Sequence, residues 1–69
     1  MKPNPFMEID IKMGSSIFCT VNIEDIQHFS ESLMVMKSGH IYILNNDITK
    51  YIEMRNTIEN YYEYLNNED

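Results

Sequence analysis

The chain has 69 residues, a hydrophobic fraction of 43%, a formal net charge of -6 and a pI near 4.6. This length has room for one small domain, residues 1–69, with a single core, and little room for a catalytic cleft with its own supporting residues. The acidic balance is the opposite of the basic surface that nucleic-acid binding needs, and it disfavours attraction to anionic lipids. We therefore expect a non-enzymatic protein that binds neither nucleic acid directly nor a membrane.

Cysteine usage and hydropathy predict a soluble cytoplasmic protein. The single cysteine, Cys19, has no partner for an internal disulfide, which is typical of a reducing compartment. The opening residues contain no apolar run of the signal-peptide kind, and no stretch approaches the length of a membrane span. We expect residues 1–5 to be flexible.

The first third of the chain predicts a β-hairpin. Residues 6–13 alternate between apolar and charged side chains, which indicates a half-buried strand with Asp10 on the solvent side. Gly14 then leads a two-residue loop of the type II′ kind. Residues 16–22 form the predicted return strand, with Cys19 on its core-facing side.

The middle of the chain predicts further short strands. Residues 22–25 break the alternation and favour a tight turn or one helical turn. Strands are predicted at residues 26–29, 33–36 and 40–45, with a hairpin loop led by Ser38-Gly39 before the last of them. Because adjacent elements usually pair, the expected sheet is an antiparallel meander of four to five strands.

One face of this meander is expected to lack a cover. If a single helix covers the other face, Met34, Met36, Phe18, Tyr42 and Leu44 would form an exposed apolar patch. An exposed patch on a small domain points to a partner surface. Residues 6–13 would also offer a free strand edge to a second copy. We therefore expect a homodimer or a higher homo-oligomer.

The last third predicts one amphipathic helix that closes the sheet and gives an α+β fold. Asp47 is the predicted N-cap, and the helix continues to about Leu65. Its predicted apolar stripe consists of Ile48, Tyr51, Ile52, Ile58, Tyr62 and Leu65, broadened by Met54 and Tyr61. Ion pairs are expected for Lys50 with Glu53 and for Arg55 with Glu59.

The end of this helix is acidic and rich in tyrosine. Glu59, Glu63, Glu68 and Asp69 follow Ile58 without any basic residue. This arrangement opposes the helix macrodipole, which favours cations at the C-terminal end. The acidic end either presents charge to a partner or frays into a solvated tail over residues 66–69. Tyr64 falls outside the apolar stripe and is expected to project into solvent or toward a partner.

Potential reactive groups do not form a recognisable site. Cys19, His28 and His40 match no spacing of metal ligands, and no fourth ligand accompanies them. Adjacent Glu24 and Asp25 supply fewer oxygen donors than calcium usually takes, so a capping or turn role is expected. We predict no catalytic residue, no metal and no cofactor.

The order of the predicted elements resembles that of the small FlbD/SwrD-like flagellar and swarming-motility proteins. The similarity covers about residues 7–64, and the matching positions are Asn22, Asp25, Ile26 and Gly39. The chain departs from the family pattern in having Ser38 before the hairpin glycine, a longer acidic C-terminus and no basic tail. The resemblance implies a bacterial accessory protein that is not an enzyme and acts by contacting other proteins.

Three functional hypotheses follow. The favoured one is a bacterial or phage protein that acts by protein–protein interaction, as an adaptor, regulator or inhibitor. Its expected partner-binding residues are Tyr64, Glu63, Glu59, Glu68, Asp69, Met34, Met36 and Tyr42. The second is an acidic mimic of nucleic acid that blocks the basic groove of a nucleic-acid enzyme, with affinity that falls as salt rises. The third is an oligomer that sequesters a small ligand, for which Arg55, Lys37 and Lys50 are the available cations.

Overall fold

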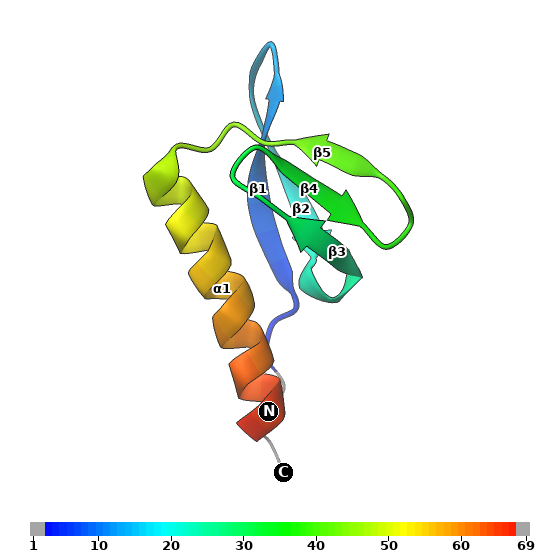
Figure 1. Cartoon of the computed structure of the whole chain (residues 1–69), viewed down its shortest axis with the longest axis vertical. Helices are drawn as coiled ribbons and strands as arrows, with labels where there is room; N and C mark the ends of the chain where they lie inside the picture. Colours follow the sequence, from blue (N-terminus) through cyan, green and yellow to red (C-terminus); the bar gives the residue numbers. More distant parts are fainter. Residues whose placement is uncertain (1–2, 68–69) are drawn as a thin grey trace.

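The computed structural model describes residues 3–67, with the backbone alone at residues 15 and 16. Within this range the elements are β1 (Phe6–Met13), β2 (Ser15–Asn22), η1 (Ile23–Asp25), β3 (Ile26–Phe29), β4 (Leu33–Met36), β5 (Ile41–Ile43) and α1 (Ile48–Asn67). All strand pairs are antiparallel, and α1 runs alongside the strands (Figure 1). The predicted α+β fold, five antiparallel strands followed by one C-terminal helix, is confirmed, although the strands form two sheets where one meander was expected.

The strands form a two-stranded sheet, β1-β2, and a three-stranded sheet, β3-β4-β5. A bridge between Ile11 and Leu44 joins the two sheets, and the Asn45 N–H donates to the Asp10 carbonyl at 2.8 Å. β1 therefore has a neighbour on both sides at this point only, and along the rest of its length it pairs with β2 alone. The prediction of a free edge over residues 6–13 is wrong at Ile11, because Leu44, which follows β5, forms a bridge with it.

The turns follow the residue types that the sequence supplies. Gly14 and Gly39 both have positive φ, at 78° and 94°, a region that residues with a Cβ avoid. Met13 pairs directly with Ser15, so the first hairpin turns on Gly14 alone, one residue fewer than predicted. At η1 the Asn22 side chain accepts a hydrogen bond from the Glu24 N–H at 2.9 Å, which confirms the predicted helical turn.

The core takes side chains from both sheets and from α1. Its buried members are Ile9, Ile11, Val21, Ile23, Ile26, Met34, Met36, Leu44, Met54, Ile58 and Tyr61. Met34 is 0% exposed and Met36 is 8% exposed, so the prediction that these methionines lie uncovered is wrong. Tyr42 pairs with Met34 and packs against the same core. Because β4 is apolar throughout, its pattern could not say which of its faces would be covered.

The helix begins as predicted, but its buried stripe differs. The Lys50 N–H donates to Asp47 Oδ1 at 2.8 Å, which confirms Asp47 as the N-cap. The buried residues are Met54, Ile58 and Tyr61, with Tyr51 and Leu65 packed beside them. The predicted stripe members Ile48, Ile52 and Tyr62 are instead exposed, at 59%, 41% and 38%. The residues of α1 that pack on the core are thus spaced alternately three and four apart: Tyr51, Met54, Ile58, Tyr61 and Leu65.

The ends of the described chain add two findings. Pro5 accepts a hydrogen bond from the Ile23 N–H at 2.7 Å, while the flexibility expected for residues 1–5 stays a prediction. Asn66 and Asn67 continue α1, the fraying expected for residues 66–69 stays a prediction, and Glu68 and Asp69 lie outside the described residues. In the part of the chain that is described, no helix combines the length and apolar character needed to cross a bilayer.

Candidate interaction surfaces

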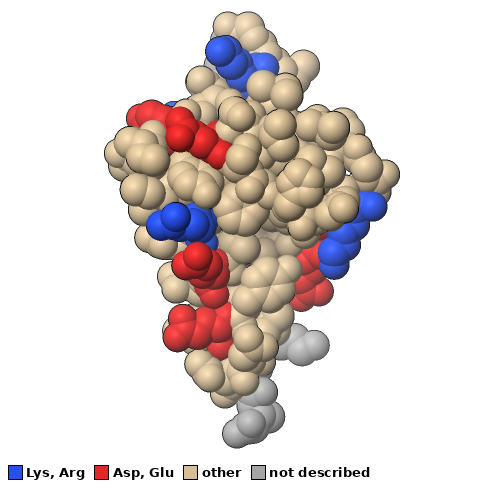
Figure 2. Space-filling model, viewed as in Figure 1, with Lys and Arg blue, Asp and Glu red and all other residues tan. Residues whose placement is uncertain are grey.

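The outer side of the three-stranded sheet is aliphatic. Leu33 pairs with Ile43, and Val35 pairs with Ile41, so these four side chains lie on the face opposite Met34. We call them the outer aliphatic face. Ile41 is 54% exposed and Ile43 is 51% exposed, whereas their neighbours on β4 are half-buried. Figure 2 shows little charge over β3–β5 in this view.

The exposed side of α1 carries three of the predicted partner-binding residues, Tyr64, Glu59 and Glu63. Tyr64 is 70% exposed, which confirms its predicted projection away from the core. Glu59 and Glu63 are exposed as well, and Glu59 Oε1 lies 3.9 Å from Arg55 Nε, as predicted for this pair. In Figure 2 a basic group lies between acidic groups along the side occupied by α1, and the lower part of that side is acidic. This surface therefore mixes charges and does not present one sign alone.

Glu24 has a role that the sequence did not reveal. The Tyr61 hydroxyl, on the second half of α1, donates to Glu24 Oε2 on η1. This hydrogen bond, with burial, raises the pKa of Tyr61 to about 12. Beside it the Tyr62 hydroxyl donates to the Ile23 carbonyl at 3.4 Å. Two adjacent tyrosines thus bond α1 to η1. Their partners lie 37 and 39 residues earlier in the chain, so no local sequence pattern could predict these contacts.

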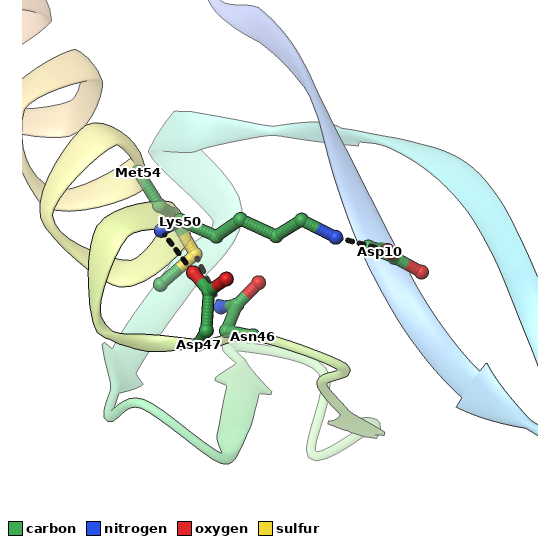
Figure 3. A network of polar contacts seen from close by, with 5 residues as sticks. All are labelled: Asp10, Asn46, Asp47, Lys50 and Met54. Carbon is green, nitrogen blue, oxygen red and sulfur yellow. Dashed lines mark hydrogen bonds and ion pairs between the residues drawn. The ribbon is translucent and has the colours of Figure 1, made fainter.

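Asp10 is the buried carboxylate among the described residues. Its side chain is 5% exposed, and Oδ2 lies 3.0 Å from Lys50 Nζ at the start of α1 (Figure 3). Asp10 Oδ1 is buried and has no hydrogen-bond partner among the described residues. The pKa of Lys50 is raised because the Asp10 carboxylate bonds and attracts its ammonium group. The predicted solvent-side position of Asp10 is wrong, and Lys50 turns to it although Glu53 was its predicted partner.

A hollow adjoins this ion pair between β1 and α1. Its volume is about 340 Å³. The lining residues are Met7, Glu8, Ile9, Asp10, Phe18, Asn46, Lys50, Glu53, Met54 and Thr57. We call it the Asp10 hollow. The sequence did not predict this hollow, because Asp10 and Lys50 on its two sides lie 40 residues apart in the chain. A single aspartate in a strand also does not indicate that its side chain is buried.

The candidate reactive residues do not assemble into a site. Cys19 is a free, half-buried thiol on β2. It lies close to Tyr42, whose pKa is raised by burial and by this thiol. His40 stacks edge-on against Tyr42 with ring centroids 4.4 Å apart, while His28 is exposed on β3. Over residues 3–67, no group of three or more histidine, cysteine or acidic side chains is arranged to hold a metal.

No known protein family, curated protein or solved structure matches this chain. The surfaces described above are therefore the basis for inferring its function.

Proposed function

We propose that this protein is a non-enzymatic interaction module that acts through protein–protein contacts and self-associates through the outer aliphatic face. The observation that supports this most directly is the exposure of Ile41 and Ile43, each about half open to solvent on a face that also holds Leu33 and Val35. Contiguous apolar surface on a small domain is typical of interaction sites. The protein would work in a reducing cytoplasm, where the free thiol of Cys19 is stable.

A second copy is the partner that the charges favour. Two chains with a net charge of -6 repel each other wherever their acidic surfaces meet. The four residues of the outer aliphatic face carry no charge, so contact there brings apolar groups together at the lowest electrostatic cost. A two-fold axis through this face would pair the same patch on both copies, as most homodimers do. The exposed side of α1, with Tyr64 and Glu63, would stay open for a further protein partner.

The mimicry hypothesis has weaker support. A mimic of nucleic acid needs closely spaced negative charges directed outward to a basic groove. Several carboxylates of this chain are instead engaged within it: Asp10 with Lys50, Glu24 with Tyr61, and Glu59 with Arg55. The resemblance to FlbD/SwrD-like accessory proteins stays a prediction, and it is compatible with an interaction module.

Self-association is tested by analytical ultracentrifugation over a range of concentrations and salt. We expect the wild-type chain to dimerise with little dependence on salt, and Ile43→Lys to be monomeric because it places a like charge at the contact. Ile48→Lys is the matched control, because Ile48 is similarly exposed, at 59%, but lies on α1. A wild-type chain that stays monomeric at every concentration, or equal disruption by both variants, would contradict the proposal.

A capture experiment separates the interaction module from the mimic. A partner protein that remains bound to immobilised wild-type chain at high salt, and is lost with Tyr64→Ala, supports the module. A nucleic-acid enzyme that binds at low salt only, and is lost with the double variant Glu59→Gln/Glu63→Gln, supports the mimic.

A further inference from the structure

One edge of β3 presents backbone groups that β4 does not bond. β3 is the outer strand of the three-stranded sheet and pairs with β4 alone in the described part of the chain. The Ser30 N–H donates to the Leu33 carbonyl at 2.8 Å. Phe29, one residue earlier, pairs with Met34. Hydrogen-bonded and non-hydrogen-bonded pairs alternate along antiparallel strands, so the N–H and C=O of Phe29 point away from β4. This edge can therefore bond a further strand.

A groove follows this edge, with α1 as its other wall. One part, of about 360 Å³, is lined by the four residues of β3, by Ile23 on η1, and by Ile58 and Tyr62 on α1. Consecutive side chains of a strand point to opposite faces, so a hollow that touches all four residues follows the edge of β3. The other part, of about 670 Å³, shares Phe29, Ile58 and Tyr62 and extends along the second half of α1 to Asn67. We call the two parts together the β3–α1 groove.

The groove is apolar along its floor and acidic at its rim. Phe29 is half-buried and Tyr62 is 38% exposed, so both contribute ring surface to the floor. On the rim Glu59 lies 3.9 Å from Arg55, and these two charges offset each other. Glu63 is exposed and forms no ion pair within residues 3–67. The groove therefore favours a ligand with apolar groups and a positive charge.

We propose that the β3–α1 groove binds an extended, basic segment of a partner protein, which pairs with the edge of β3 as an added strand. The outward N–H and C=O of Phe29 select an extended backbone, because strand addition bonds the main chain and leaves the side chains for specificity. Apolar side chains on one face of the segment contact Phe29 and Tyr62, and a lysine or arginine pairs with Glu63. A second copy of this chain is disfavoured there, because it also carries a net charge of -6.

This inference rests on the proposed function, in so far as the protein acts through protein–protein contacts. Self-association uses the outer aliphatic face and is measured by ultracentrifugation, so failure of either result leaves the other standing. The groove is tested by titration of the full chain, followed by two-dimensional NMR of backbone amides. The probes are a capped hexapeptide of alternating valine and lysine, the matching valine–glutamate peptide, and two valine–lysine peptides that are N-methylated at the valines or at the lysines.

We expect saturable shifts at Gln27, Phe29 and Glu63 with the valine–lysine peptide, and binding of the valine–glutamate peptide at least about 10-fold weaker at low salt. In the free chain the Phe29 amide should exchange with solvent faster than the Ser30 amide, which is bonded to Leu33. It should become protected when the peptide binds, because its N–H gains an acceptor. At least one N-methylated peptide should lose binding, since one edge of the added strand must supply N–H groups to β3.

Three results would overturn the proposal. The first is the absence of saturable shifts at millimolar concentrations of the valine–lysine peptide, or equal binding of the valine–glutamate peptide. The second is a Phe29 amide that stays unprotected at saturation. The third is undiminished binding of both N-methylated peptides, which would show that the peptide backbone does not pair with β3.

A charge reversal tests the rim of the groove. Glu63→Lys should weaken binding of the valine–lysine peptide about 3-fold or more and strengthen that of the valine–glutamate peptide, because it reverses the charge that the segment meets. Glu53→Lys changes the net charge equally, but Glu53 is exposed on the first half of α1 and does not line the groove, so it is the matched control. Equal effects of the two variants would show a response to net charge alone and would overturn the assignment of Glu63.

Discussion

Truncation of Met34 is the sharpest test of where the core lies. Met34 is 0% exposed at the centre of the three-stranded sheet, between β3 and β5. Ile43 lies on the neighbouring strand, on the opposite face, and is 51% exposed. Met34→Ala and Ile43→Ala thus compare two apolar residues of adjacent strands that differ mainly in the face they occupy.

The expected magnitudes follow from burial. Truncation of a buried methionine to alanine costs about 2–5 kcal/mol, because the cost of the cavity that remains adds to the lost free energy of transfer from water. A chain of 69 residues has a total free energy of unfolding of about 3–10 kcal/mol, from roughly 0.05–0.15 kcal/mol per residue. Met34→Ala should therefore remove a large share of the stability. Ile43→Ala leaves no cavity and removes a half-exposed group, so we expect a loss of about 1 kcal/mol or less.

The measurement is urea unfolding followed by circular dichroism, at protein concentrations low enough that self-association does not contribute. The slope of the unfolding free energy against urea should be the same for both variants, and the midpoints should differ. At about 4–8 °C per kcal/mol for a domain of this size, the difference should also appear in thermal melts. Equal destabilisation by the two variants, or a larger loss with Ile43→Ala, would refute the assignment of Met34 to the core and of Ile43 to the surface.

Three further predictions concern single contacts. The pKa of Tyr61 is about 12 in the folded state against about 10 in an unfolded chain, so this group stabilises the folded state below pH 10, and its contribution is lost as the pH rises from 10 to 12. In Tyr61→Phe the free energy of unfolding should therefore fall less steeply over this pH range. An equally reduced fall in the control Tyr64→Phe would show that the bond to Glu24 is not the cause. Gly39→Ala should lower the free energy of unfolding, measured in urea, by about 1–2 kcal/mol, because φ is 94° while no atom crowds the added methyl group. Gly39→Asn should lower it less. An alanine variant as stable as the wild type would be inconsistent with the positive φ. Asp47→Ala should lower the free energy of unfolding by about 1 kcal/mol in the same measurement, because the helix loses its N-cap. Asp47→Ser should restore it, since serine also caps helices. A serine variant as unstable as the alanine variant would show that capping is not the cause.

The local sequence was sufficient for the order of the elements and for some of their ends, whereas the strand predicted at residues 40–45 is observed at Ile41–Ile43 and α1 continues past Leu65 to Asn67. The observed bounds of β1, β3 and β4 agree with the predicted ones, from alternation in β1 and an uninterrupted apolar run in β4. The residue types of Gly14, Gly39, Asn22 and Asp47 indicated where the turns and the helix cap lie. These features depend on interactions within a few residues, which is the range that period, φ preference and capping describe.

Which faces are buried was decided by tertiary contacts. In β4 both faces are apolar, so the pattern Leu33 to Met36 fits either orientation. Met34 is buried because it joins the core formed with β1, β2, η1 and α1, while the face of Ile43 stays exposed. The same holds for α1, where the apolar residues are broad enough to allow two stripes and the sheet selects the one through Ile58.

The sequence by itself determined the α+β order of elements, the hairpin turns and the start of the helix, together with an acidic composition that argues against direct binding of nucleic acid. The tertiary structure alone decided that Asp10 is buried beside Lys50, that Glu24 receives the Tyr61 hydroxyl, and that the exposed apolar face contains Ile41 and Ile43, not Met34 and Met36. The physical reason is the same in each case. These contacts join residues on different elements, and their free energies depend on which surfaces the whole chain brings together and removes from water.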